Sequence, residues 1–367
     1  MQVSAAVMGN KSGRFEIEQL ELDEPREGEL LVRIAGVGIC HTDLAVRDQT
    51  FPVRLPAVLG HEGSGVVARI GAGVRTIIPG DHVVLSFGSC GHCGRCDEGN
   101  PAYCQRAASL NMTGVRKSDG LSVYRDTKGE HVYGSFFGQS SFGTYALTNE
   151  RNAVKIAKDV PVELMGPLGC GIQTGAGTVM NVLKPRAGSS IVIFGAGSVG
   201  LAAVMAARVV DCTTIVAVDL NDQRLALAQS LGATHIINGG RDNVLATIKN
   251  ILHFGAHHSV ECTGNPVVLR HAVDCLQPKG SCAMVGVAGL ATEVSLNMQF
   301  MLNGRTLRGV MEGDSNPAVF IPQLIALWRE GRFPFDRLVK FYPFEDINQA
   351  VTDTELGRVL KPILRPG

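Results

Sequence analysis

One stretch decides the fold of this chain: Ile191-Val-Ile-Phe-Gly195-Ala-Gly197-Ser-Val-Gly200. Its apolar residues predict a buried strand, its glycines a tight turn, and the run that follows, 198–210, a helix. In this context the spacing Gly-x-Gly-x-x-Gly is typical of a dinucleotide site. The turn lets a pyrophosphate approach the N–H groups at the N-terminus of the helix. We expect the site to be lined by Gly195, Gly197, Ser198, Val199 and Gly200.

An acidic residue follows at the end of the next predicted strand. Asp219 lies nineteen residues after Gly200 and is followed by Leu220 rather than by an arginine. A carboxylate in this place accepts hydrogen bonds from the adenosine ribose and repels a 2′-phosphate, so we expect NAD rather than NADP. Arg224 could lie along the same ribose, but a solvated charge on the predicted helix 222–231 is an equal explanation.

Two kinds of pattern divide the chain. From residue 172 to 311, strands alternate with helices, with further strands expected at 214–218, 235–237, 258–261 and 281–287. This alternation predicts right-handed βαβ units and a doubly wound parallel sheet. Residues 1–171 show short apolar runs broken by glycine and proline, which indicates a β-rich, barrel-like domain, and 312–367 should return to it. The predicted class is α/β plus β.

Composition narrows the class of protein. The chain has 367 residues, 45% hydrophobic and 19% charged, and Lys+Arg equals Asp+Glu at 34 each. Without a basic stripe, neither nucleic acid nor an anionic membrane is an expected partner. No apolar region typical of a signal peptide opens the chain, and no stretch approaches about 18 apolar residues. We expect a cytoplasmic protein that acts on a small molecule.

The cysteines are clustered. Four of the ten lie between residues 90 and 104, namely Cys90, Cys93, Cys96 and Cys104. Without a secretory signal, the spacing C-x2-C-x2-C-x7-C favours a metal over disulfides. Four thiolates suit a closed, tetrahedral structural zinc site that pins the polar loop 88–132. Reactive thiols and an iron–sulfur cluster are the alternatives, although the further cysteines and the proline of a ferredoxin run are missing.

Three separated segments offer a second set of ligands. They are Gly38-Ile-Cys40-His-Thr42-Asp43, Gly60-His61-Glu62-Gly63 and Pro167-Leu-Gly-Cys170. Two thiolates and one imidazole suit a catalytic zinc, which takes three protein ligands and leaves a position open. Such an ion acts as a Lewis acid toward an alcohol oxygen. Sequence spacing alone does not join segments so far apart.

The neighbours of these ligands suggest supporting roles. Thr42 places a hydroxyl where it could accept the alcohol proton. Asp43 could hold the second nitrogen of His61 and so fix the tautomer of the imidazole. Glu62 is a candidate outer carboxylate that could enter the coordination sphere during ligand exchange.

With these three sites, the chain resembles the zinc-containing medium-chain alcohol dehydrogenases over essentially its whole length. The metal segments, the four-cysteine lobe, Cys170-Gly-Ile-Gln-Thr174-Gly and the glycine turn occur in the order of the family. The resemblance implies a GroES-like catalytic domain, 1–171 and 312–367, around a Rossmann domain, 172–311. It also implies a homodimer or homotetramer, a catalytic zinc on Cys40, His61 and Cys170, and a structural zinc on the four clustered cysteines.

The resemblance assigns further roles. Thr42 matches the hydroxyl that bonds the substrate oxygen, and Thr174 matches a residue beside the nicotinamide. His41 and Lys361 match cations that the family places against the pyrophosphate. Val287 and Val310 match residues near the carboxamide of the nicotinamide.

One position departs from the family. Many members carry a histidine five residues after the first ligand cysteine, where it ends a proton relay, and this chain has Ala45. The proton must then leave by water or by another group, and Arg47 is the nearest cationic candidate.

Within the family, three stretches are most similar to aryl-alcohol dehydrogenases: Cys40-His-Thr-Asp-Leu-Ala-Val-Arg-Asp-Gln, Gly134-Ser-Phe-Phe-Gly-Gln-Ser-Ser-Phe and Lys340-Phe-Tyr-Pro-Phe. This resemblance puts Phe51, Phe87, Phe136 and Phe137 near the pocket. Aromatic walls suit a flat apolar substrate, although most phenylalanines are core residues. The expected reaction is reversible oxidation of a primary, aromatic alcohol to its aldehyde, with hydride transfer to NAD.

Other functions stay open. A glutathione-dependent formaldehyde dehydrogenase would need polar or basic groups for an anionic adduct, and a general primary-alcohol dehydrogenase would need no aromatic walls. A metal-depleted nucleotide-binding relative would have no use for the three ligands. A redox sensor is the least favoured alternative, because four thiolates that are bound to a metal ion make a poor sensor. Cys212, Cys262, Cys275 and Cys282 have no assigned role beyond packing.

Overall fold

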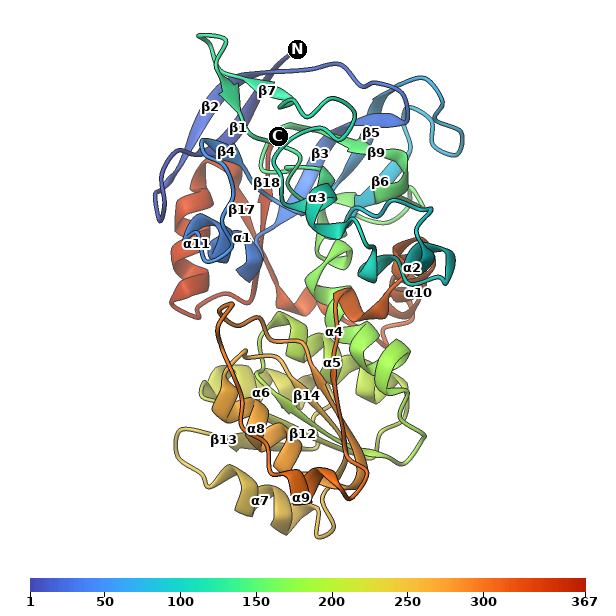
Figure 1. Cartoon of the computed structure of the whole chain (residues 1–367), viewed down its shortest axis with the longest axis vertical. Helices are drawn as coiled ribbons and strands as arrows, with labels where there is room; N and C mark the ends of the chain where they lie inside the picture. The colour runs from blue at the N-terminus through green and yellow to red at the C-terminus, as the bar shows by residue number, and fades with distance from the viewer. The chain divides into compact units, whose positions relative to one another are not determined.

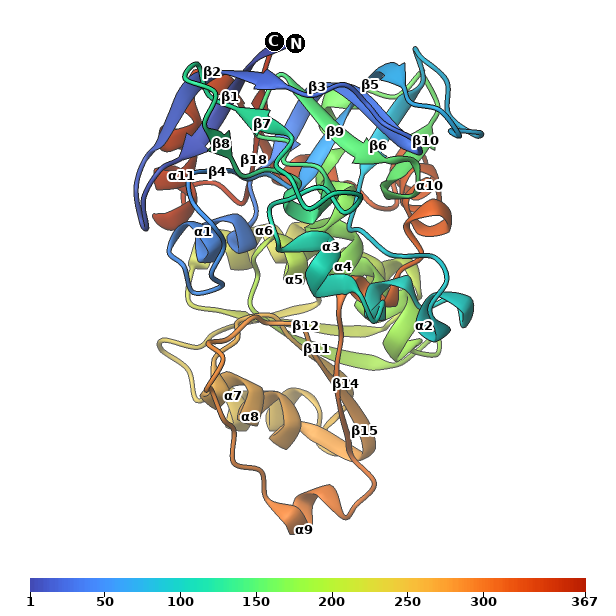
Figure 2. The ribbon, with the colours of Figure 1, turned by 45° about the horizontal axis from the view of Figure 1, so that its top comes forward.

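The computed structural model describes residues 1–367 and divides them into two compact units. Unit 1 comprises Met1–Cys170, Asn316–Gln323 and Asp336–Gly367, and unit 2 comprises Gly171–Ser315 and Leu324–Phe335. In Figures 1 and 2, unit 1 carries the blue-to-green and the red segments, and unit 2 the yellow-green to orange ones. The sequence assigned all of 312–367 to the first domain, whereas Leu324–Phe335 group with the second unit.

Unit 2 is built on a parallel six-stranded sheet with the order β13-β12-β11-β14-β15-β16. Its strands are β11 (Ser190–Phe194), β12 (Thr214–Asp219), β13 (His235–Asn238), β14 (Ala256–Glu261), β15 (Leu276–Met284) and β16 (Thr306–Gly309). The strand order reverses at β11, which lies between β12 and β14. In open sheets of this kind, ligands bind outside the carboxyl ends of the strands at such a switch point.

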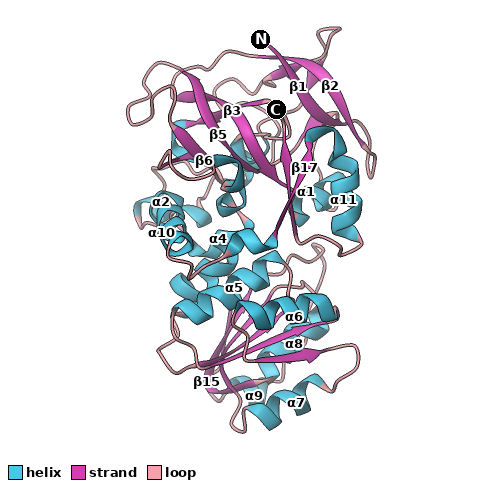
Figure 3. Cartoon of the chain, turned by 180° about the vertical axis from the view of Figure 1, so that it is seen from behind, coloured by secondary structure: helices cyan, strands magenta, loops and turns pink.

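Helices cover both faces of this sheet. They are α4 (Gly171–Gly177), α5 (Ser198–Val209), α6 (Asp222–Leu231), α7 (Val244–Ile251), α8 (Pro266–Asp274) and the short α9 (Met298–Met301). Figure 2 shows α5 and α6 on one side of the strands β11 and β12, with α7 and α8 on the other, and Figure 3 shows the same elements from behind. Every residue of β11 is buried, as expected for a central strand of a parallel sheet covered on both faces. The doubly wound fold is thus confirmed.

Two strands of unit 2 differ from expectation. The strand expected at 281–287 runs instead over Leu276–Met284, because the N–H groups of Val285 and Gly286 turn to the carbonyl of Glu261. No residue pattern predicted β16, a largely exposed edge strand.

Unit 1 contains two mostly antiparallel sheets. One has the order β4-β1-β2-β7-β8, and the other has the order β10-β6-β5-β3-β18-β17 with β9 also paired to β3. The first comprises β1 (Gln2–Met8), β2 (Phe15–Leu22), β4 (Ala57–Val58), β7 (Tyr124–Arg125) and β8 (His131–Val132). The second comprises β3 (Glu29–Gly38), β5 (Glu62–Ile70), β6 (His82–Leu85), β9 (Tyr145–Asn149), β10 (Ala153–Ile156), β17 (Val339–Pro343) and β18 (Lys361–Arg365).

The helices of unit 1 are short. They are α1 (His41–Arg47), α2 (Gly94–Asp97), α3 (Ala107–Asn111) and α11 (Ile347–Glu355), while α10 (Pro317–Arg329) has residues in both units. One continuous apolar core packs residues of both sheets together. The last strand, β18, pairs with β3 at Val37 and Gly38 and so brings Lys361 to the start of β5. No helix in the structure combines the length and the apolar character needed to cross a membrane.

Candidate active site

Three side chains from separate segments of unit 1 converge on one point. Cys40 precedes α1, His61 precedes β5, and Cys170 follows the 3-10 helix Gly166–Gly169. Their sulfur and imidazole nitrogen atoms all lie within 4.8 Å of one another, and His61 is fully buried. The structure therefore joins the three ligands that spacing alone could not connect.

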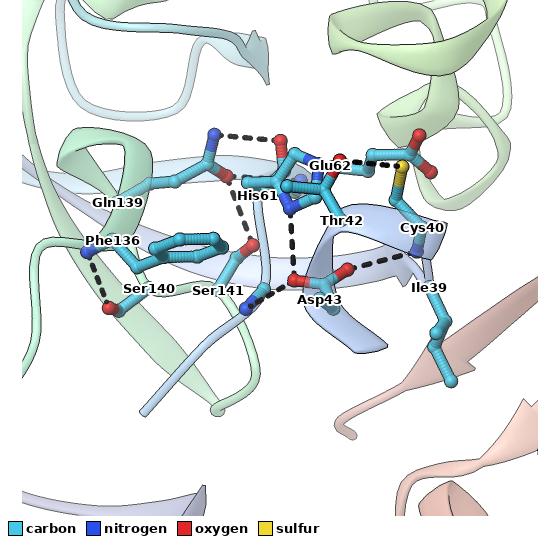
Figure 4. Close-up of polar contacts among 12 residues, drawn as sticks. Ile39, Cys40, Thr42, Asp43, His61, Glu62, Phe136, Gln139, Ser140 and Ser141 are labelled. Atoms are coloured by element: carbon cyan, nitrogen blue, oxygen red, sulfur yellow. Dashed lines mark hydrogen bonds and ion pairs between the residues drawn. The ribbon is translucent and has the colours of Figure 1, made fainter. Parts of the chain in front are cut away.

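A carboxylate fixes the orientation of the imidazole. Asp43 Oδ1 lies 2.9 Å from His61 Nδ1 and accepts a bond from the N–H of Gly60, while Oδ2 accepts one from the N–H of Cys40 (Figure 4). Because Nδ1 donates to a carboxylate, Nε2 is left as the basic nitrogen. Nε2 is buried and has no hydrogen-bond partner.

A cation fits this donor set. A buried polar atom without a partner costs free energy, and a metal ion between Nε2 and the two sulfurs removes that cost. A hydrogen bond with Cys170, helped by the charge of Lys361, holds the pKa of the Cys40 thiol well below its usual range despite burial. A lowered pKa favours the thiolate, which is the form that binds zinc.

Glu62, next to the ligand His61, forms a buried ion pair with Lys361. Lys361 Nζ is 2.9 Å from Glu62 Oε1 and 2.8 Å from Oε2, and it also donates to the carbonyl of Ile39. Burial disfavours the ammonium, but its hydrogen bond with Glu62 and the charges of Glu62, Cys40 and Cys170 together outweigh burial, so the pKa of Lys361 is raised. A Cβ at Gly38 would lie 2.1 Å from Glu62 Oε2, so only glycine leaves room for this carboxylate.

This pairing bears on the role expected for Lys361. The residue is 1% exposed and its ammonium is bound by Glu62 inside unit 1, and its contact with a pyrophosphate stays a prediction. His41, in contrast, is exposed at the first position of α1.

Thr42 lies beside the first ligand. Its Oγ1 is 3.8 Å from Cys40 Sγ, and the residue is partly exposed.

Arg47 is less suited to the proton exit proposed for it. Its guanidinium is bound by Asp48 and Glu355, whose hydrogen bonds raise its pKa. Ala45 leaves no titratable side chain at the relay position.

Two of the four predicted pocket phenylalanines contact the imidazole. The ring of Phe137 stacks on His61 at a centroid distance of 4.5 Å and 27°, and Phe136 meets it edge-on at 5.5 Å. Phe136 is buried, whereas Phe137 keeps part of its surface exposed. Phe51 packs against the core and Phe87 is buried, and neither has a ring contact with His61.

Sequence reasoning missed Gln139. Its side chain is 1% exposed and bonds the main chain on both sides of Glu62 (Figure 4). An isolated glutamine between Gly138 and Ser140 belongs to no spacing motif, so only coordinates show it.

The clustered cysteines form a second donor set. The sulfurs of Cys90, Cys93, Cys96 and Cys104 lie within 4.8 Å of one another, with Cys90–Cys96 at 4.0 Å and Cys93–Cys104 at 3.9 Å. These are not disulfide distances. They approach the roughly 3.8 Å edge of a tetrahedron with zinc–sulfur bonds of about 2.3 Å. Backbone N–H groups of Cys96 and Gln105 lower the pKa of the Cys93 thiol to about 6.

The glycine turn of unit 2 has the geometry of a phosphate cradle. Gly195 has φ +93°, and a Cβ at Gly200 would lie 1.8 Å from the carbonyl oxygen of Gly195, so both positions require glycine. Gly197 caps α5 without a side chain, and nothing lies within 4 Å of its Cβ position. The turn therefore leaves the N–H groups of Ser198 and Val199 at the start of the helix open to a ligand.

Asp219 is coupled to this turn. Its Oδ2 accepts a bond of 2.6 Å from the N–H of Ala196, and its Oδ1 accepts one from Asn221. Arg224 follows on α6, and its Nε is buried without a hydrogen-bond partner. A carboxylate and an unpaired guanidinium nitrogen on neighbouring elements suit recognition of a ribose.

The other residues predicted near the cofactor are also in unit 2. Thr174 Oγ1 bonds Glu312 Oε2 at 3.3 Å, Val310 is buried and Val287 is 54% exposed. Their contacts with a nicotinamide stay predictions.

Comparison with known proteins defines the class. The alcohol dehydrogenase GroES-like domain matches residues 26–158, and the zinc-binding dehydrogenase domain matches residues 198–328. Together with the two donor sets and the doubly wound sheet, these matches show that the chain belongs to the zinc-containing medium-chain alcohol dehydrogenases.

Individual relatives are similar over their full length. Geraniol dehydrogenase from Castellaniella defragrans is 47% identical over 366 residues, 99% of this chain and 98% of that protein. The crystal structure of benzyl alcohol dehydrogenase from Acinetobacter calcoaceticus is 48% identical, with a TM-score of 0.97 and 100% of both chains covered. S-(hydroxymethyl)glutathione dehydrogenase from Paracoccus denitrificans is 31% identical, over 99% of this chain and 100% of that one.

The four-cysteine lobe generates a prediction about metal content. Cys96→Ser removes one donor from the tetrahedron, so we expect the purified enzyme to lose one zinc ion per chain and its Tm to fall by roughly 5 °C or more. Metal analysis and calorimetry measure both effects. Cys212→Ala, which removes a thiol outside both donor sets, is the control and should keep the metal content of the wild type. An unchanged zinc content in Cys96→Ser would show that the lobe holds no ion.

Proposed function

We propose that this enzyme oxidises primary alcohols whose carbinol carbon is attached to a flat, unsaturated carbon, with aromatic alcohols of the benzyl type as the principal substrates. The products are the aldehyde and NADH, and the reaction is reversible. The observation that carries the proposal is the triangle of Cys40, His61 and Cys170, in which Nε2 has no partner and the ring of Phe137 stacks on the imidazole.

The relatives support this choice of substrate. Geraniol and benzyl alcohol, the substrates named for two proteins nearly half identical to this chain, share one chemical feature. In both, the CH2OH group is attached to an sp2 carbon. Flat substituents of this kind pack well on aromatic rings in offset or edge-on geometry, and Phe137 offers a partly exposed ring next to a ligand.

The chain's own side chains divide the work of the reaction. Zinc bound at the triangle would supply Lewis acidity toward the alcohol oxygen. Thr42, beside Cys40, accepts the hydroxyl proton and passes it to water, because Ala45 and the ion-paired Arg47 provide no relay. Asp43 keeps the proton of His61 on Nδ1, so Nε2 stays a ligand. For each R–CH2OH oxidised, the hydride goes to NAD⁺ and one H⁺ is released.

NAD is part of the proposal. Asp219 lies at the end of β12 against the glycine turn, where its charge favours two ribose hydroxyls over a phosphate. A second zinc in the four-cysteine lobe would pin the loop around it. Assembly as a homodimer or homotetramer, which the family resemblance implies, and a cytoplasmic location complete the proposal.

A second candidate is oxidation of S-(hydroxymethyl)glutathione, the substrate named for one relative at 31% identity. That substrate is anionic and needs cationic groups near the metal. The cations near the three ligands are already held in ion pairs. Lys361 is paired with Glu62, and Arg47 is paired with Asp48 and Glu355. Formaldehyde oxidation that requires glutathione would nevertheless favour this candidate.

Substrate preference is tested by a matched pair of alcohols. We expect kcat/KM with NAD to be at least tenfold higher for benzyl alcohol than for cyclohexylmethanol, and higher for geraniol than for its saturated analogue. Ethanol should be poor. Phe137→Leu should lower the benzyl preference about fivefold, since an aromatic contact contributes about 1 kcal/mol. Phe15→Leu, which alters a core ring pair, is the control and should leave the preference unchanged. A wild type that prefers ethanol contradicts the assignment.

Cofactor preference is tested at Asp219. Asp219→Asn keeps the shape and removes the charge that repels a 2′-phosphate, so the ratio of kcat/KM for NAD over NADP should fall about tenfold, equivalent to about 1.4 kcal/mol. Asp222→Asn removes a nearby exposed carboxylate that is paired with Arg241 and should leave the ratio unchanged. Equal ratios in wild type and Asp219→Asn would remove Asp219 from cofactor selection.

A further inference from the structure

The buried amide of Gln139 bonds the chain that carries a metal ligand. Oε1 accepts from the N–H of Gly63 at 3.1 Å and from Ser141 Oγ at 3.0 Å, and Nε2 donates to the carbonyl of His61 at 3.0 Å (Figure 4). The carboxamide therefore bonds the main chain on both sides of Glu62, while the side chain of Glu62 bonds Lys361. The side chain of Gln139 is 1% exposed, so water does not replace these bonds.

The hydrogen bonds of the carboxamide follow the pattern that an adjacent strand makes. In a parallel pair of strands, one residue accepts from the N–H after its partner and donates to the carbonyl before it. The carboxamide of Gln139 does the same around Glu62. It is needed there because β6 pairs with β5 only from Ser64 onward. The side chain thus extends the support of β5 back to His61.

The backbone around Gln139 is held in an unfavourable conformation. Ser135, Phe137, Gly138 and Ser140 have φ values of 57°, 50°, 66° and 50°, and three of the four are not glycine. Ser140 Oγ stabilises the segment by accepting from the N–H of Phe136 and donating to the carbonyl of Val58. Strain of this kind persists where the surroundings enforce it, and it clusters at functional sites. Here it directs Gln139 inward and sets both phenylalanine rings against the imidazole.

We propose that Gln139 is a positioning residue for the catalytic metal ion. Asp43 sets the rotation of the His61 ring, and Gln139 sets the main chain from which that ring projects, so that Nε2 keeps its place between the sulfurs of Cys40 and Cys170. The proposal rests on the proposed function, in which those three residues hold zinc.

The expected effect follows from the tolerance of metal sites. Ligand distances in such sites hold to about ±0.2 Å, and loss of a supporting hydrogen bond commonly lowers metal affinity about 10–100-fold. Gln139→Met keeps the length and volume of the side chain but removes its bonds to His61 and Gly63. Gln139→Glu keeps an acceptor for Gly63 and loses the donor to the His61 carbonyl.

The experiment measures release of zinc from the full-length holoenzyme to a chromophoric chelator. Gln139→Met should release the ion of the Cys40–His61–Cys170 site about 10–100-fold faster than wild type, and Gln139→Glu should lie between them. The release phase of the four-cysteine lobe should not change. With cobalt in place of zinc, the thiolate-to-cobalt absorption of the catalytic site should shift in Gln139→Met. kcat for benzyl alcohol should fall while KM for NAD stays the same.

The control is a second amide that makes the same kind of contact away from the metal. Asn348 bonds both the N–H and the carbonyl of Phe15, at 2.9 and 2.8 Å. Asn348→Leu should lower Tm without changing zinc release or the cobalt spectrum. Should Gln139→Met not fold, Gln139→Glu alone decides: faster release than wild type supports the proposal, and wild-type release overturns it.

Two failures can be told apart. A Gln139→Met enzyme that releases zinc at the wild-type rate, or no faster than Asn348→Leu, overturns the positioning role and leaves the proposed function intact. A wild-type enzyme that purifies with no ion at Cys40, His61 and Cys170, or does not oxidise alcohols, overturns the proposed function before any variant is compared.

Discussion

The bond between Asp43 and the Nδ1 of His61 is the interaction on which the site depends. It decides which imidazole nitrogen carries the proton and thereby leaves the other one as a buried lone pair without a protein partner. The same carboxylate accepts from the N–H groups of Cys40 and Gly60, so it ties the start of α1 to the loop before β5. A single buried charge therefore sets the tautomer of one ligand and the spacing of two segments.

Around this bond, two features of the fold cost free energy and help to place the ligands. Left-handed backbone at Phe137 and Ser140 costs on the order of 1–3 kcal/mol for each residue. The Glu62–Lys361 pair is desolvated on both sides, and such pairs add little net stability compared with apolar replacements. Neither feature is explained by packing alone. Both are understandable if the structure is selected for a rigid ligand triangle rather than for maximum stability.

The sequence allowed much of unit 2 to be predicted, because strand, turn and helix signals there are local. β11 and α6 begin and end where their patterns do, whereas β16 is exposed and carries no apolar alternation. The ligands could be named only through family resemblance, since Cys40, His61 and Cys170 meet by tertiary folding. Gln139 and the partner of Lys361 escaped prediction for the same reason. Their roles depend on contacts with residues that are distant in the sequence, and no local residue pattern predicts such contacts.

The return of the chain through β18 has a consequence for biosynthesis. Glu62 and Lys361 are separated by 299 positions, so the ribosome makes the buried carboxylate long before its counter-charge. During that interval, the strand that begins at Glu62 carries an acid with no ammonium to neutralise it. Burial of an unpaired charge is strongly unfavourable, so the first unit should stay loosely packed until the final strand arrives. Maturation of the first unit is in this way coupled to completion of the polypeptide.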